Sequence, residues 1–169
     1  SFPNLPMRLK VGCAAAELNE KKGIANLLCA IYEFRRISEL EIVCELVGAV
    51  DEPALCQYNQ LIADLGLEGN VFFLGYKSRE ELGMIMREWD FYIQASIAEG
   101  HPNSVLEAWR NGTAFISTPT GRTFEILKDT YSDLFFESWD PVVISNKLKY
   151  LSELENKELI YKKAYEYHY

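Results

Sequence analysis

Short apolar runs alternate with amphipathic stretches along this chain, and the alternation limits the folds that it can adopt. The apolar runs have the length of β-strands. They occupy residues 8–13, 41–47, 70–74, 90–94, 114–118 and 133–137. Between them, apolar residues recur at three- and four-residue spacing, which is typical of amphipathic helices. This pattern predicts helices over residues 23–38, 53–65, 78–88, 103–112, 141–153 and 155–167.

Strands that alternate with helices of this length predict right-handed crossovers and a parallel sheet with helices on both faces. Six such strands indicate a Rossmann-like, doubly wound α/β domain, which we expect over residues 7–153. A length of 169 residues suits one domain of this kind. Residues 1–6 precede it as a connecting segment, and residues 154–169 are expected to form a C-terminal helix partly outside the compact body.

The composition excludes several classes of protein. Hydrophobic residues make up 49% of the chain, which is too apolar for a disordered segment. The net charge of −8 argues against nucleic acid as a partner, because phosphate-backbone binders present a basic surface. No apolar run reaches the roughly 18 residues that a membrane span needs. The first ten residues carry two prolines and no apolar core segment, so they do not resemble a secretory signal.

The cysteines do not form a recognisable framework. They contain no C-x-x-C pair and lie mostly in apolar runs, which indicates reduced, buried thiols in a cytoplasmic protein. The four are Cys13, Cys29, Cys44 and Cys56. Only two histidines, His101 and His168, are present, so we predict no metal site.

The expected binding crevice lies at the carboxyl ends of the strands, near the switch in strand order. The loops that reach this edge are residues 12–22, 48–52, 75–78, 95–103 and 118–124. The dinucleotide fingerprint G-x-G-x-x-G is absent after the first strand, where the sequence reads VGCAAAELNEKKG. A nicotinamide cofactor is therefore not expected, and we predict no cofactor.

Residues 96–112 concentrate groups that could bind an anion and a sugar. Glu99 precedes the predicted helix, Glu107 lies inside it, and Pro102 suits its first position. Gly100 allows close approach of the backbone to a ligand. Backbone amides at a helix N-terminus bind anions without a basic side chain. Here these amides belong to Asn103, Ser104 and Val105.

This segment, written S-x-x-E-G-x-P-N-x-x-L-E-A-x-x-x-G, resembles the nucleotide-sugar motif of GT-B glycosyltransferases, especially the large retaining family 4. Lys22-Gly23 before an amphipathic helix follows the order and spacing of that family. So do the segments LEIVCELVG, LEGNVFFLGYKSREELGMIMREWDFYIQAS and GTAFISTPTGRTFEIL. The resemblance covers about residues 8–150, and it identifies the donor-binding half of a GT-B fold.

The resemblance implies a role for each matching residue. Glu99 would contact hydroxyls of the donor sugar, and Glu107 would hold the ribose hydroxyls. Lys22 would share the diphosphate with amides around Ser104 and Val105 and stabilise charge as the nucleotide leaves. The other residues implied in binding are Gly100, His101, Asn103, Tyr76 and Lys77, with Tyr76-Lys77 near the base. The donor would be a UDP- or GDP-sugar.

The sequence departs from the family at two positions. Family members often have an arginine beside the glycine after the first strand, where this chain has Cys13. Arg110 or Arg122 could supply that second cation. The usual phenylalanine after Glu-Gly is replaced by His101. These changes concern the strength of diphosphate binding more than its location.

The family folds as two domains around a cleft, and this chain resembles only the second. Residues 1–6 would then end an interdomain connection, and the N-terminal acceptor domain would be missing. The resemblance implies hexosyl transfer with retention, in capsule, lipopolysaccharide or other polysaccharide biosynthesis. It also implies a cytoplasmic location, with association at the inner face of the membrane through the missing half. We expect the isolated domain to bind its nucleotide weakly and to transfer nothing.

Simpler alternatives stay open at each position. Glu107 could be a solvated helix residue, Glu99 a loop carboxylate or cap, and Lys22 part of a solvated pair with Lys21. The whole chain could be a non-catalytic, transferase-like binding module or one subunit of a split enzyme. Cys13 favours that alternative, whereas the intact Glu99 and Glu107 favour the enzyme.

Overall fold

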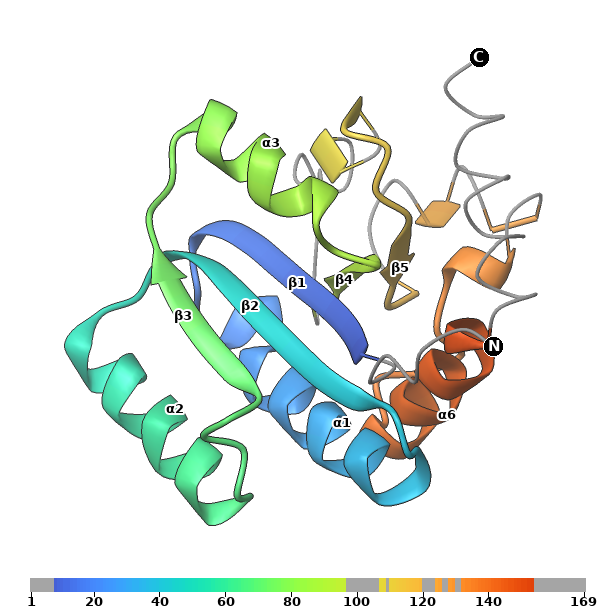
Figure 1. Ribbon diagram of the computed structural model, residues 1–169, viewed down its shortest axis with the longest axis horizontal. Helices are drawn as coiled ribbons and strands as arrows, with labels where there is room; N and C mark the ends of the chain where they lie inside the picture. The colour runs from blue at the N-terminus through green and yellow to red at the C-terminus, as the bar shows by residue number, and fades with distance from the viewer. Residues whose placement is uncertain are drawn as a thin grey trace, which may run out of the picture.

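A five-stranded parallel sheet forms the centre of the molecule (Figure 1). A computed structural model describes residues 8–96, 107–108, 110–119, 124–125, 128–129 and 132–153. The strands are β1 (Arg8–Glu17), β2 (Glu41–Ala49), β3 (Val71–Gly75), β4 (Phe91–Gln94) and β5 (Phe115–Ser117). Their order in the sheet is β3-β2-β1-β4-β5, and every pair is parallel. This order confirms the predicted doubly wound α/β class and places the switch point between β1 and β4.

The first strand is longer than its apolar pattern predicts. We expected the chain to leave the sheet after residue 13, but β1 pairs with β2 as far as Glu17, opposite Ala49, with an irregularity after Ala14. The alanines at positions 14–16 have a low strand propensity, but this propensity depends on context, and pairing with β2 overrides it here. The loop that reaches Lys22 is therefore shorter than the predicted 12–22.

The sixth strand, predicted over residues 133–137, is not formed. The chain makes a 3-10 turn, η2 (Ser132–Leu134), followed by a single parallel bridge between Ser117 and Phe135. Phe135 and Phe136 are buried, so the apolar signal at this point reflects packing against the sheet edge. Phe135 meets the ring of Phe115 edge-on, with centroids 6.2 Å apart.

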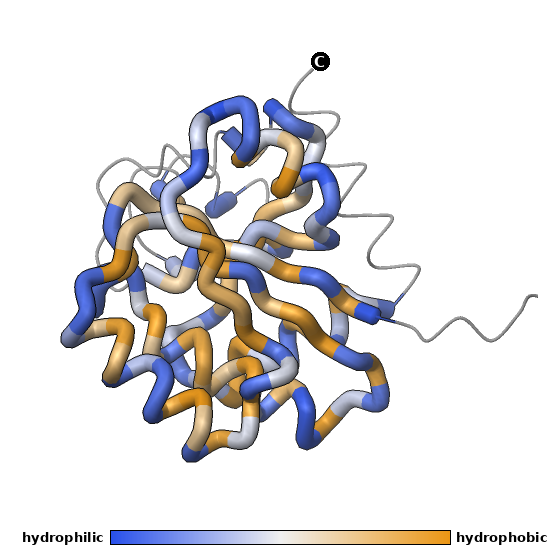
Figure 2. The backbone as a smooth tube through the Cα atoms, turned by 60° about the vertical axis from the view of Figure 1, so that its left-hand side comes forward, coloured by the Kyte–Doolittle hydropathy of each residue, from blue (hydrophilic) through white to orange (hydrophobic). Residues whose placement is uncertain are grey.

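Helices cover both faces of the sheet. On one side lie α1 (Ile24–Ile37), α2 (Glu52–Asp64) and α6 (Pro141–Ser152), and on the other side lies α3 (Arg79–Arg87) (Figure 1). Tyr58 of α2 stacks on Phe73 of β3 with ring centroids 6.1 Å apart. Along the lower helices of Figure 2 the backbone alternates between apolar and polar residues, as amphipathic packing requires.

The observed helix bounds follow local capping chemistry. Asp51 caps α2 and Asp140 caps α6, each by accepting a hydrogen bond from a backbone amide. Ser78 and Glu81 form a reciprocal capping box at the start of α3. These bonds from Ser78 are the main reason that the pKa of Glu81 is lowered. The bounds lie within about a residue of the predicted ones, whereas the predicted helices 103–112 and 155–167 fall largely outside the described residues.

Among the described residues, no helix is both long and apolar enough to cross a membrane.

Candidate functional site

The loop after β1 brings Lys22 to the carboxyl edge of the sheet, beside the end of β4. Lys22 is half-buried in the 3-10 turn η1 (Glu20–Lys22). Gly23 follows with φ +66°, and a Cβ at this position would collide with the carbonyl oxygen of Ala95. Only glycine combines this conformation with so close an approach. The sequence Lys-Gly therefore fixes the start of α1 against the residues that lead into the Glu99 segment.

The same turn is tied to α2. The hydroxyl of Tyr58 donates to Oε1 of Glu20 at 3.4 Å. Burial, with Glu20 as a second cause, raises the pKa of Tyr58 to about 12. Tyr58 therefore stays protonated across the physiological pH range. Its hydroxyl can donate to Glu20 and so hold η1 against α2.

Two arginines form ion pairs with Glu107. Nε and Nη2 of Arg79 lie 3.2 and 3.4 Å from its two carboxylate oxygens, and Nη1 of Arg110 lies 3.5 Å from Oε2. The Glu107 side chain is 18% exposed, so it is neither a freely solvated helix residue nor a core residue. A carboxylate offers about four acceptor positions, so room remains for a hydroxyl donor.

Tyr76 and Lys77 lie in the connection from β3 to α3, directly before Ser78 and Arg79. Tyr76 is 77% exposed, and Lys77 is half-buried. Arg79 joins this connection to Glu107, so the two regions assigned to base and ribose are brought together. Arg79 was missed by sequence reasoning, because nothing local marks its partner 28 residues away.

A second feature missed in the sequence is a buried polar network at the end of β4. It comprises Tyr92, Gln94 and Ser96, with Thr118 and Trp139 from neighbouring segments. Polar residues at every second position of an otherwise apolar strand were the available signal.

The remaining predicted site residues differ in what the structure shows of them. Glu99, Gly100, His101, Asn103, Ser104 and Val105 lie outside the described residues, as does Arg122. Arg110 contacts Glu107, so its guanidinium is already engaged with a carboxylate. Cys13 is 2% exposed and belongs to the apolar core, which leaves it no role at the ligand. Burial raises the pKa of the neighbouring Cys44 thiol far above its ordinary value, with Cys13 and Glu45 as lesser causes.

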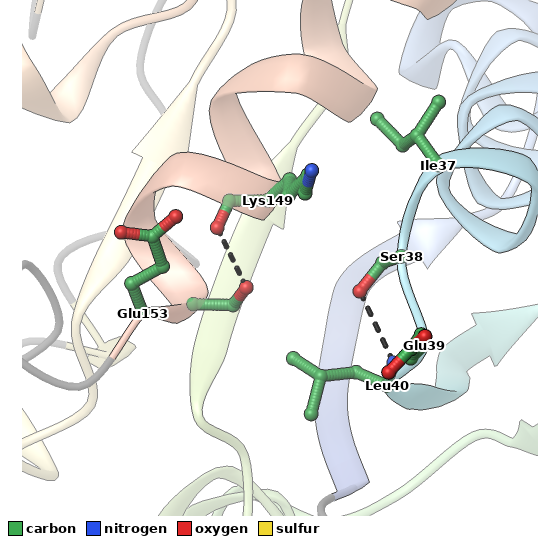
Figure 3. Close-up of a pocket in the computed structure, with 7 residues that line it drawn as sticks. Ile37, Ser38, Glu39, Leu40, Lys149 and Glu153 are labelled. Carbon is green, nitrogen blue, oxygen red and sulfur yellow. Dashed lines mark hydrogen bonds between the residues drawn. The ribbon is translucent and has the colours of Figure 1, made fainter.

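A pocket of about 630 Å³ lies at the opposite edge of the sheet, between the ends of α1 and α6 (Figure 3). Its lining residues are Ile37, Ser38, Glu39, Leu40, Lys149, Ser152 and Glu153. Ser38 Oγ accepts from the Leu40 amide, and Ser152 Oγ donates to the Lys149 carbonyl. Both hydroxyls are thus engaged with nearby backbone groups. None of the predicted site residues lines this pocket.

Comparison with known families decides the class of the protein. Residues 3–167 match the family described as Glycosyl transferases group 1. The chain belongs to this glycosyltransferase family. The match spans nearly the whole sequence, including all five described strands, so it agrees with the resemblance that residues 96–112 suggested.

Curated relatives of this group 1 domain include glycosyltransferases. A mannosylfructose-phosphate synthase of Agrobacterium fabrum is 31% identical over 139 residues, or 78% of this chain and 30% of that protein. An N,N'-diacetylbacillosaminyl-diphospho-undecaprenol α-1,3-N-acetylgalactosaminyltransferase of Campylobacter jejuni is 28% identical over 114 residues, or 68% and 29%. The chain thus spans about a third of the length of the curated relatives that it matches.

Solved structures share the fold. Anabaena Alr3699/HepE in complex with UDP matches with a TM-score of 0.78 at 20% identity, over 93% of this chain and 42% of that one. The C-terminal domain of a glycosyl transferase group 1 family protein, LpcC, from Francisella tularensis matches at 0.79 and 22%, over 96% and 85%. These likenesses confirm the Rossmann-like domain of GT-B proteins as the fold.

Proposed function

We propose that this group 1 domain binds the donor of a glycosyltransferase that moves a sugar from a nucleoside-diphosphate sugar to a hydroxyl acceptor with retention, as in family 4. The observation that carries the proposal is the Glu107 carboxylate, held by Arg79 beside the Tyr76–Lys77 connection. The UDP complex of the structural neighbour HepE supports a nucleotide as the ligand.

Each part of the donor has a proposed partner. Ribose hydroxyls donate to Glu107, and the base lies near Tyr76 and Lys77. The diphosphate takes Lys22 and the amides of Asn103, Ser104 and Val105. Glu99, with Gly100 and His101, takes the hydroxyls of the sugar. Lys22 stabilises the charge that grows on the diphosphate as the nucleotide leaves, which favours the transition state over the bound donor.

The acceptor side of the reaction lies outside this domain in the proposal. A second, N-terminal domain supplies the acceptor site and contacts the cytoplasmic face of the membrane. The diphospho-undecaprenol substrate in the name of the Campylobacter relative supports transfer of a hexose-type sugar to a lipid-linked acceptor, and we place this transfer in surface polysaccharide synthesis. The 169-residue chain alone then binds nucleotide but transfers no sugar.

Isothermal titration calorimetry with UDP and GDP tests the donor site. We expect one nucleotide to bind in the millimolar range or tighter, and Glu107→Ala to weaken it about tenfold or more, since it removes a charged hydrogen-bond acceptor. Absence of heat with both nucleotides at millimolar concentration would contradict the proposed function.

A second candidate is a transferase-like domain that binds nucleotide without catalysis. The specific observation in its favour is Cys13, which is buried where family members often carry a cation. Sugar transfer by this chain together with the proposed N-terminal domain, supplied in trans, would exclude this candidate.

A further inference from the structure

Three polar side chains line β4 at the point where β1 and β4 separate. The two strands pair at Val11–Phe91 and Gly12–Tyr92, after which β1 continues beside β2 and β4 beside β5. In a doubly wound sheet this separation is the point where ligands bind. Tyr92, Gln94 and Ser96 follow at every second position, and all three are buried. We call these three residues the polar row.

The Tyr92 hydroxyl takes the place of a missing strand partner. It donates to the carbonyl oxygen of Ala14 at 2.9 Å, and the amide of Ala14 donates to it over 3.4 Å. Ala14 is buried, and buried backbone groups without partners are costly. The hydroxyl therefore lets the two strands diverge while both backbone groups of Ala14 stay paired.

From Tyr92 the polar row runs on to the end of β4. Its hydroxyl lies 3.2 Å from Oε1 of Gln94, and Nε2 of Gln94 donates to Oγ of Ser96 at 2.7 Å. The Ser96 carbonyl accepts from Oγ1 of Thr118 at 2.7 Å and from Nε1 of Trp139 at 3.0 Å. Two donors occupy both lone pairs of this carbonyl. The one hydroxyl proton of Tyr92 is shared between the Ala14 carbonyl and Oε1 of Gln94, so a series of polar contacts joins β1 to Ser96.

We propose that the polar row is a positioning element that sets the spacing between the ends of β1 and β4 for a nucleoside diphosphate. This inference rests on the proposed function, which assigns the diphosphate to Lys22, after β1, and to the segment that follows Ser96. The row acts through these two chain ends and does not itself touch the ligand. The nucleoside is assigned to other elements, through Glu107 and Tyr76. Loss of the row should therefore affect the terminal phosphate more than the nucleoside.

Calorimetry with UDP and UMP on the full chain separates these contributions. In Tyr92→Phe and Gln94→Met, we expect the preference for UDP over UMP to fall about three- to tenfold, the range for one buried hydrogen bond, with UMP affinity unchanged. Tyr32→Phe in the middle of α1 is the matched control, because it removes a tyrosine hydroxyl away from the row. It should keep the wild-type preference.

Each outcome decides a different point. An unchanged preference in folded variants would overturn the positioning role, and so would equal weakening of UDP and UMP, which marks a merely structural role. If the wild-type chain binds neither nucleotide, the proposed donor site itself fails. Thermal unfolding checks that the variants fold. If Tyr92→Phe does not fold, Gln94→Met and Ser96→Ala carry the test, because both keep the bonds to Ala14.

Discussion

Arg79 is the residue that most changes how Glu107 is understood. Glu107 was singled out by its spacing from Glu99, but spacing alone does not show what orients its carboxylate. Arg79 contacts both of its oxygens from the first turn of α3. Because the Arg79 side chain is 74% exposed, the pair contributes little to folding, about 0–1 kcal/mol. Its effect should appear in ligand binding.

We expect Arg79→Ala to weaken UDP binding about three- to tenfold by freeing the Glu107 carboxylate to take other orientations. Calorimetry measures the affinity, and thermal unfolding should show almost no change in stability. Arg8→Ala is the control, because it removes an exposed arginine that pairs with a glutamate, Glu41, 3.5 Å away at the amino end of its strand. An unchanged UDP affinity in Arg79→Ala would contradict the orienting role.

At this scale the sequence predicts residues that follow a linear motif and misses those that depend on distant partners. Lys22 could be found because it directly precedes Gly23, and Glu107 because of its spacing from Glu99 within the motif. Arg79 could not, since helix position and charge give no sign of a partner 28 residues away. The burial of Cys13 agrees with the buried thiols predicted from the apolar runs, whereas the continuation of β1 through the alanines could not be predicted.

At the scale of elements, α3 follows the Tyr76–Lys77 connection that leaves the sheet. The Ser78 cap determines where this helix begins. We expect Ser78→Ala to destabilise the chain by about 1 kcal/mol, because the amide of Glu81 loses its side-chain acceptor. Chemical denaturation measures this change in the free energy of unfolding. Ser38→Ala at the pocket of Figure 3 provides a comparison, because Ser38 accepts from the Leu40 amide but begins no helix. A smaller loss in Ser78→Ala than in Ser38→Ala would contradict the importance of the cap.

Tyr58, which joins η1 to α2, makes the free energy of unfolding depend on pH in the alkaline range. Its pKa is raised to about 12 in the folded chain against an ordinary value of 10.0, so the folded state holds this proton more tightly than the unfolded state. The associated stability is complete below about pH 10 and is lost as the pH rises towards 12.

Stability curves of the wild type and Tyr58→Phe between pH 8 and 12 check this prediction. The wild type should lose more stability across that interval than the variant, which has no phenol to ionise. Parallel curves would show that Tyr58 ionises equally easily in both states.

The elements themselves were largely predictable, and the exceptions have physical causes. Four strands and four helices were expected within a residue or two of their observed bounds, because capping residues and apolar periodicity agree there. β1 was predicted too short, since alanine gives no strand signal, and residues 133–137 were predicted as a strand because buried phenylalanines pack there without a ladder.

At the scale of the whole molecule, the candidate site and the pocket lie at opposite edges of the sheet. The carboxyl edge carries Lys22, Tyr76 and the polar row, whereas the pocket of Figure 3 lies at the amino edge. We expect Lys22→Ala to weaken UDP binding at least threefold through loss of the charge that we propose for the diphosphate. Lys149→Ala, which removes the same charge from the pocket, should leave the affinity unchanged. Calorimetry at one ionic strength compares the two, and equal effects would argue for long-range attraction rather than a local contact.

The exposure of Tyr76 has a practical consequence for altering this domain. Its side chain projects from a connection whose fold depends on the neighbouring Ser78 cap, so exchanging Tyr76 removes little packing. Gly23, by contrast, tolerates no side chain at all. If Tyr76 and Lys77 lie near the base as proposed, a library that varies them while preserving Lys22, Gly23 and Ser78 would sample nucleobase preference at nearly constant thermal stability.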